Sequence, residues 1–169
     1  MGWYHAKNIL DGEIPSARLT DIVEPWFLGD GAEGASGEAF AAFANEHPSV
    51  NFHKSLDDME AATGAKVALI SGRTSDNPKL FEAVVAKGCT MVYLEKPGAP
   101  TVAELEAMKV LAESKGVKVY MGYNKNVTKV GVGHRDFSKC AEPPWGVVWQ
   151  SRDPYWVPAR GRASQGCPR

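Results

Sequence analysis

Short apolar runs alternate with amphipathic segments along the first part of the chain. Apolar runs bounded by turn residues predict strands, and apolar residues at helical spacing predict helices. The predicted strands span residues 17–24, 50–53, 67–70, 91–94 and 117–121, and the predicted helices span 2–10, 40–47, 77–87 and 101–115. Strands that alternate with helices favour right-handed crossovers between parallel strands. The pattern therefore predicts an α/β fold, with a doubly wound parallel sheet and helices on both of its faces.

Local signals mark several predicted helix ends. Thr101 is followed by Glu104, and Ser55 by Asp58, at the spacing of a capping box at a helix start. Gly116 follows the last turn of the helix that Thr101 begins, and glycine commonly ends a helix.

After about residue 129 the pattern changes. Prolines recur there, and the tryptophans follow neither a helical nor a strand period. These residues are Pro143, Pro144, Pro154, Pro158, Pro168, Trp145, Trp149 and Trp156. We therefore divide the chain into a domain at 1–129 and an irregular Pro/Trp-rich tail at 130–169. Two interpretations of the tail are open: an arm whose tryptophans pack on the domain, or a chain end that did not evolve with the rest, such as an altered reading frame.

Charge and cysteine content exclude several classes of partner. The formal net charge is -1 and no block of like charges stands out, so neither nucleic acid nor a membrane is indicated. Cys89, Cys140 and Cys167 are widely spaced and odd in number, which favours a reducing compartment over a disulfide framework. No metal site is predicted. Because the chain shows neither a signal-peptide pattern nor an apolar run near the ~20 residues that cross a bilayer, we expect a cytoplasmic protein.

One apolar run ends abruptly in reactive residues. The 91–94 segment leads into Glu95, Lys96 and Pro97. In an open parallel sheet, ligands bind beyond the carboxyl ends of the strands, so Lys96 is expected at the crevice. Pro97 has no amide hydrogen and restricts the backbone before it, which aims the ammonium group. For an isolated tripeptide, an ordinary turn with a solvated lysine is the competing interpretation.

The order of three features resembles the nucleotide-binding half of one enzyme family. Glu95-Lys96-Pro97 ends a strand, the 101–115 helix follows, and Gly122-Tyr123-Asn124-Lys125-Asn126 comes after the next strand. Over residues 2–127 the chain resembles the NAD(P)-dependent oxidoreductases of the glucose-fructose oxidoreductase, inositol dehydrogenase and rhizopine-catabolism protein family (Gfo/Idh/MocA). The resemblance implies a Rossmann-like domain. In the family, a larger mixed sheet follows this domain, shapes the substrate pocket and supports oligomers.

The same resemblance implies that one strand is missing. In the family, a first strand and a Gly-x-Gly-x-x-Gly turn precede the first helix and receive the pyrophosphate. Neither is found before Gly2, which is similar to the last glycine of that turn. We therefore expect a domain truncated at both ends, with the first strand missing and an exposed edge or groove in the sheet that favours aggregation.

The resemblance implies an adenosine site at the end of the 17–24 strand. Glu24 stands about 20 residues beyond the glycine turn, where the family's acid bonds the adenosine ribose, and its charge favours NAD over NADP. Pro25 and Trp26 would flank the adenine, although Trp26 is equally typical of a core residue.

A second loop is similar to the one that passes under the nicotinamide ribose. It contains Ser71, Gly72 and Arg73, with Asn77 further on. Relatives usually carry a Thr-Pro pair and a later histidine there. Contact between cofactor and backbone is still expected, whereas Arg73 is also typical of a surface residue in a turn.

Lys96 corresponds to the lysine that the family carries at this strand end, and the resemblance therefore implies that Lys96 is the catalytic residue. In relatives this lysine reaches the nicotinamide and the reacting carbon, where a cation polarises oxygen or assists proton transfer. Glu95 and Pro97 would shape the turn beside the cofactor. Tyr123 and Asn124 would border the substrate, while the residues after them depart from the basic pair common in relatives.

These inferences predict an NAD-dependent oxidoreductase domain. The parent reaction transfers hydride between the nicotinamide and an alcohol carbon of a sugar or polyol. The family's acid-base histidine and aspartate come from its second domain, and the neighbouring His134 and Asp136 do not reproduce that arrangement. The remaining histidines are interpreted as helix-surface, turn or strand residues. The alternative function is a noncatalytic scaffold that acts as a binding or interaction module.

Overall fold

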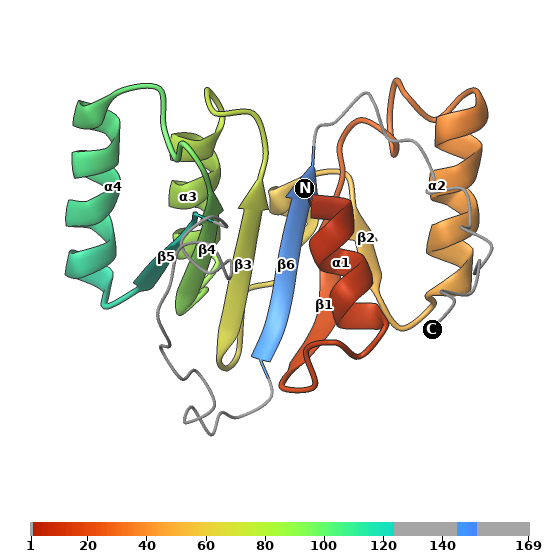
Figure 1. Ribbon diagram of the computed structural model, residues 1–169, viewed down its shortest axis with the longest axis horizontal. Helices are drawn as coiled ribbons and strands as arrows, with labels where there is room; N and C mark the ends of the chain where they lie inside the picture. The colour runs from red at the N-terminus through yellow and green to blue at the C-terminus, as the bar shows by residue number, and fades with distance from the viewer. Residues whose placement is uncertain (1, 124–144, 152–169) are drawn as a thin grey trace, which may run out of the picture.

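Six parallel strands form one sheet in the computed structural model, which describes residues 2–123 and 145–151 (Figure 1). The strands are β1 (Ala17–Val23), β2 (Asn51–His53), β3 (Lys66–Ser71), β4 (Met91–Glu95), β5 (Lys118–Gly122) and β6 (Trp145–Ser151). The helices are α1 (Gly2–Leu10), α2 (Ala35–Glu46), α3 (Asn77–Ala86) and α4 (Val102–Lys115), with a 3-10 turn η1 at Leu56–Asp58. The order across the sheet is β2-β1-β6-β3-β4-β5, and each neighbouring pair is parallel. The predicted Rossmann-like α/β fold is confirmed.

The predicted capping signals set the ends of the elements. The Thr101 hydroxyl accepts the Glu104 amide at 3.2 Å, so α4 begins at the following residue. Gly116 ends this helix in the left-handed conformation, with φ of 66°, which glycine adopts without steric cost. The box of Ser55 and Asp58 is also formed, but it opens only the short turn η1. The crossover from β2 to β3 therefore contains no α-helix.

Helices cover both faces of the sheet, each over its own apolar core. Along β3 and β4, alternate side chains enter opposite cores, as the pleat of a strand requires. The α1 and α2 side is built around Ala6, Ile9, Leu19, Ile22, Phe40, Phe43 and Leu69. The α3 and α4 side is built around Val23, Ala68, Ile70, Phe81, Val84, Val92, Leu94, Met108 and Ala112. The sheet is thus buried between two helical layers, as the near-continuous apolar strands indicated.

The sheet is continuous where the sequence predicted a missing strand. β6 lies between β1 and β3, and its Trp149 is in register with Ile22 on one side and Leu69 on the other. In the strand order 3-2-1-4-5-6 of a dinucleotide-binding fold, β6 takes the place of strand 1. The expected gap is therefore filled, and the prediction of an irregular tail is wrong for residues 145–151.

The reason for this error is that a central parallel strand carries little signal of its own. It is flanked by strands on both sides and buried on both faces, so it shows no alternation, and β6 offers only a short apolar run between prolines. The other residues of the predicted tail, including His134 and Asp136, lie outside the described residues. The division at 129 and 130 stays a prediction.

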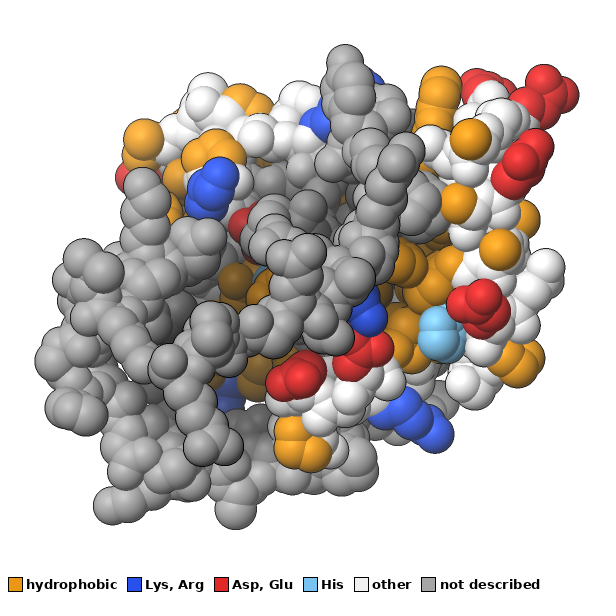
Figure 2. All heavy atoms as spheres, turned by 45° about the vertical axis from the view of Figure 1, so that its right-hand side comes forward, with side chains coloured by type: hydrophobic (Ala, Val, Ile, Leu, Met, Phe, Trp, Pro, Cys, Tyr) orange, Lys and Arg blue, Asp and Glu red, His pale blue; other side chains and the backbone are white. Residues whose placement is uncertain are grey.

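The side of the molecule that carries α2 is acidic. Figure 2 shows acidic side chains gathered there, and the sequence from Glu24 to His53 contains no lysine or arginine. A polyanion would be repelled from this side. Among the described helices, none has the length and apolar character needed to cross a membrane.

Candidate functional site

The predicted site residues gather at one edge of the sheet because the strands are parallel. β1 is followed by Glu24, β3 ends at Ser71 and β4 ends at Glu95, so these three residues lie at the same carboxyl edge. The beginning of α1, at Gly2, lies beside the carboxyl end of β6 at this edge (Figure 1). Segments far apart in the sequence are thereby brought together.

A tight turn holds Lys96 at this edge. The Lys96–Pro97 peptide bond is cis, and the Gly98 amide donates to the Glu95 carbonyl at 3.1 Å. Gly98 has φ of 91°, and a Cβ there would lie 2.8 Å from the side chains of Leu105 and Met121. The positive φ is the conformation that favours glycine, and an added Cβ would also require the Leu105 and Met121 side-chain ends to shift. Lys96 and Pro97 are exposed, which leaves the ammonium group accessible.

A buried amide ties this turn to the loop after β3. Asn77 is 2% exposed, and its Nδ2 donates to the Gly98 carbonyl at 2.9 Å. A Cβ on Gly72 would lie 2.8 Å from Leu80 and 3.5 Å from the Asn77 Oδ1 atom, so the loop packs closely on α3. The buried Asn77 side chain therefore stabilises the Lys96 turn through this hydrogen bond and does not reach the surface.

The other predicted residues of the loop differ in exposure. Ser71 has a buried hydroxyl without a hydrogen-bond partner among the described residues, whereas Arg73 is exposed. At the end of β5, Tyr123 is 52% exposed. Its predicted neighbour Asn124 lies outside the described residues.

Glu95 has a partner that the sequence did not indicate. Its Oε1 atom lies 2.8 Å from Nε2 of His5, which projects from α1. The His5 ring also packs edge-on against Tyr93, with ring centroids 5.3 Å apart. Burial, and then the nearby Glu95 carboxylate, raise the pKa of Tyr93. The interpretation of His5 as a simple helix-surface residue needs correction, because it links α1 to the strand that carries Lys96.

Glu24 organises the turn at the end of β1. It is fully buried at 0% exposure, and its Oε1 accepts the Trp26 amide at 3.1 Å. Trp26 itself is 43% exposed and is not a core residue. A Cβ on Gly31 would lie 2.1 Å from Nε1 of Trp26, so the glycine lets the ring lie against the loop. The turn therefore offers an exposed aromatic ring, with half-buried Pro25 beside it.

No metal centre is evident in the parts of the chain that the structure describes. Residues 2–123 and 145–151 contain no group of three or more His, Cys, Asp or Glu side chains arranged to hold an ion.

Comparison by sequence identifies one family. A model of the oxidoreductase family with an NAD-binding Rossmann fold matches residues 32–123, which is more than half of the chain. No relative is found among the curated proteins. The matched segment includes the Lys96 turn, the Ser71 loop and all of α4.

The chain is also similar to solved structures of proposed oxidoreductases. A proposed oxidoreductase from Bacillus subtilis aligns with 15% identity and a TM-score of 0.50, over 67% of this chain and 37% of that chain. A proposed oxidoreductase from Bacteroides fragilis aligns with 12% identity and a TM-score of 0.46, over 64% and 36%. The chain thus spans little more than a third of the length of these structures.

Proposed function

The chain belongs to the oxidoreductase family with an NAD-binding Rossmann fold, and on this premise we propose that the carboxyl edge of its sheet binds a nicotinamide dinucleotide. The observation that carries the proposal is the hydrogen bond from Asn77 to Gly98. It joins the loop after β3 to the Lys96 turn, so the two segments predicted to surround the nicotinamide form one unit.

Several features of this edge fit the parts of such a cofactor. The first backbone amides of α1, from Gly2 on, have no partner within the helix and favour an anionic group. The exposed Trp26 ring offers apolar area to an adenine. The Ser71 hydroxyl is buried without a partner among the described residues, as expected of a group beside a ligand. When bound, the cofactor supplies the carbon that exchanges hydride.

We assign the acid-base chemistry to Lys96. Its exposed ammonium group can donate a hydrogen bond to the oxygen of an alcohol or carbonyl and can exchange a proton with it. Tyr123, at the end of the neighbouring β5, gives a substrate an aromatic surface. The proposed substrate is a sugar or polyol with a secondary alcohol, and Asn124 would border it.

We propose NAD as the cofactor in preference to NADP. The argument rests on Glu24, whose carboxylate lies inside the turn that ends β1. A carboxylate at this position would accept a hydrogen bond from a ribose hydroxyl and would repel a 2'-phosphate. The proposed setting is the cytoplasm.

Calorimetric titration with NADH and NADPH tests this function. We expect NADH to bind, and to bind more tightly than NADPH. A screen of polyols with NAD should then detect turnover, which Lys96→Ala lowers by about 100-fold or more while NADH binding is retained. Lys79→Ala, an exposed residue on α3, is the matched control and should leave both unchanged.

Two results would overturn parts of the proposal. No binding of either dinucleotide at millimolar concentration would remove the cofactor site. Binding of NADH without turnover on any polyol would instead favour the noncatalytic scaffold.

A further inference from the structure

A hydrogen bond joins the first helix to the residue that precedes Lys96. His5 projects from α1, and its Nε2 atom lies 2.8 Å from Oε1 of Glu95. An ionised carboxylate only accepts hydrogen bonds, so the imidazole donates. The two side chains are 18% and 10% exposed, and a contact so well shielded from water is stronger than one at the surface. The contact therefore holds its two partners together.

The neighbours of this pair leave it little freedom. The His5 ring packs edge-on against Tyr93, with ring centroids 5.3 Å apart. Gly122 of β5 is in register with Glu95, and a Cβ on this glycine would lie 3.1 Å from Oε2 of Glu95 and 2.8 Å from the Tyr93 hydroxyl oxygen. Glycine at this position therefore leaves the space that the Glu95 carboxylate occupies beside β5.

Glu95 is held at two points, and both affect the lysine turn. Its side chain contacts His5, and its carbonyl accepts the Gly98 amide at 3.1 Å, which closes the turn around Lys96. His5 stands three residues after Gly2, so it lies about 4.5 Å along the axis of α1 from the amides proposed to receive the pyrophosphate. The pair therefore links the proposed pyrophosphate site to the turn that carries the lysine.

We propose that His5 is a positioning residue for Lys96. Through Glu95 it fixes the distance between the amino end of α1 and the lysine turn, so that a dinucleotide bound at α1 meets the lysine at its nicotinamide end. This role rests on the proposed function, because it concerns the same cofactor site. The holding of the turn by His5 is a property of the chain itself and can be measured without a cofactor.

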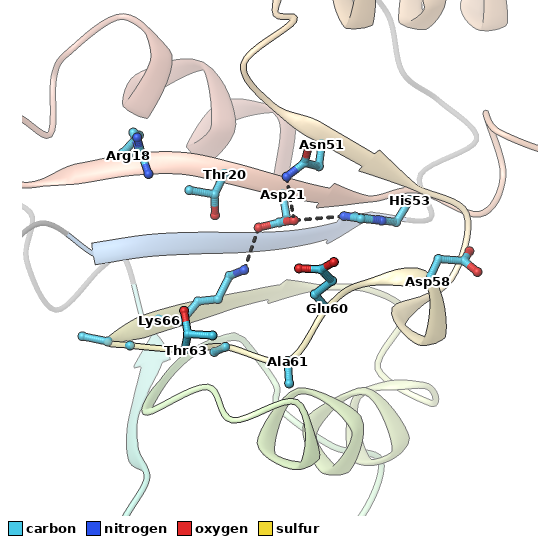
Figure 3. A pocket seen from close by; sticks show the side chains of 13 residues that line it. Arg18, Thr20, Asp21, Asn51, His53, Asp58, Glu60, Ala61, Thr63 and Lys66 are labelled. Carbon is cyan, nitrogen blue, oxygen red and sulfur yellow. Dashed lines mark hydrogen bonds and ion pairs between the residues drawn. The ribbon is translucent and has the colours of Figure 1, made fainter.

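A second contact between a histidine and a carboxylate provides an internal comparison. It lies in a polar groove of ≈ 710 Å³, bounded by β1, β2, the start of β3 and the loop at residues 58–65 (Figure 3). Nε2 of His53 lies 2.9 Å from the Asp21 carboxylate, which also accepts Lys66 Nζ at 2.7 Å and Asn51 Nδ2 at 3.4 Å. Burial acts to raise the pKa of Asp21, but the hydrogen bonds from Lys66 and His53 outweigh it and leave this pKa lowered.

The groove pair is remote from the lysine turn. His53 lies on β2, and in the strand order this strand is four positions away from β4, which leads into Lys96. Four steps between neighbouring strands correspond to about 19 Å. A variant at His53 therefore loses a contact of the same kind without touching the lysine turn.

Hydrogen-deuterium exchange of the chain without cofactor tests the positioning role. His5→Phe keeps a ring beside Tyr93 but has no donor, and Glu95→Ala removes the acceptor. We expect each variant to speed exchange at residues 95–98 by about 10-fold, the factor that a hydrogen bond to a charged group contributes. The double variant should add little, because both changes break the same contact. His5→Gln, whose amide can replace the Nε2 donor, should restore slow exchange.

Turnover separates positioning from a merely structural role. With NAD and a polyol, His5→Phe should lower kcat by about 10- to 100-fold and change the KM for NAD by less than about 3-fold, because a misplaced catalytic group affects the chemical step more than binding. His53→Phe is the matched control and should change neither kcat nor exchange at residues 95–98. The thermal unfolding temperature checks that each variant folds, and a folded Glu95→Ala suffices for the exchange test if His5→Phe does not fold.

Several results would overturn the positioning role. These are exchange at residues 95–98 that matches the original chain in the folded His5→Phe and Glu95→Ala variants, exchange in His5→Gln as fast as in His5→Phe, and an equal effect of His53→Phe. An unchanged kcat in folded His5→Phe would also overturn it. If the original chain binds no dinucleotide, the proposed function fails, whereas the exchange comparison still decides whether His5 holds the turn.

Discussion

At the scale of single residues, one buried amide holds the candidate cofactor site together. The sequence placed Asn77 at a helix start near the cofactor, and the structure agrees on the place but shows a different partner. Its side chain donates to Gly98, which lies 21 residues away. The side chains of His5 and Glu95 also contact each other, although these residues are 90 positions apart in the chain. Local propensity cannot reveal such pairs, because they exist only once the strands have assembled.

Replacing Asn77 with alanine should destabilise the fold. The Gly98 carbonyl would lose its side-chain donor in a buried position, which costs about 1 to 3 kcal/mol in the free energy of unfolding. Urea denaturation measures this change, and Lys79→Ala on the same helix is the control. Equal unfolding midpoints for the two variants would show that the Asn77 side chain does not stabilise the fold.

Asp21 should make stability depend on pH. Its pKa is lowered in the folded state from the ordinary value of 3.8, so the carboxylate stabilises the fold above about pH 4. This contribution is lost as the pH falls through the lowered pKa. Asp21→Asn should therefore reduce the free energy of unfolding by about 2 kcal/mol at pH 7, since Lys66 loses its anion.

The loss caused by Asp21→Asn should shrink as the pH falls below about 4, because Asp21 of the unfolded chain is then protonated while the folded carboxylate, with its lowered pKa, stays charged to lower pH. Urea unfolding of both proteins from pH 7 down to pH 3 measures the difference. If the difference in unfolding free energy between the two proteins stayed constant over this range, the pKa of Asp21 would not be lowered in the folded state. Glu106→Gln, at an exposed position on α4, should have the same free energy of unfolding as the original protein at both pH 7 and pH 3.

At the scale of elements, the sequence predicted what is locally encoded. Thr101 and Glu104 fixed the start of α4, and Gly116 fixed its end. β6 was missed because its partners, β1 and β3, lie more than 70 residues before it in the chain. The groove residues were missed for a related reason. Asp21, His53 and Lys66 come from three strands, and nothing in their spacing indicates that they meet.

The central position of β6 predicts that its backbone is sensitive to proline. Val148 pairs with Asp21 of β1 and Ala68 of β3. Val148→Pro removes a backbone donor from the middle of the sheet and should lower the free energy of unfolding by at least about 2 kcal/mol. Val148→Thr keeps the donor and the branched shape, so it serves as the control in urea denaturation. If the proline and threonine variants unfold at the same urea concentration, β6 is not a central strand.

At the scale of the whole molecule, β6 changes the expected behaviour in solution. The sequence predicted a gap in the sheet and, from it, aggregation. With β6 between β1 and β3, the strands at the two ends of the sheet are β2 and β5. The physical reason for expecting aggregation through a central gap no longer holds.

The structure also contains a polar groove beyond the Lys96 turn. The Lys96 turn and the loop from Ser71 to Asn77 lie at the carboxyl edge of the sheet. The groove over Asp21 and Lys66 opens on one face, beside the loop at 58–65.

Hydrogen-deuterium exchange with and without saturating NADH tests the central claim most directly, because it locates the cofactor on the chain. Exchange should slow at residues 71–77 and 95–98, which the Asn77 hydrogen bond joins, and should stay unchanged at 58–66 along the groove. Unaltered exchange at both 71–77 and 95–98, or slowing confined to the groove, would contradict a dinucleotide site at the carboxyl edge of the sheet.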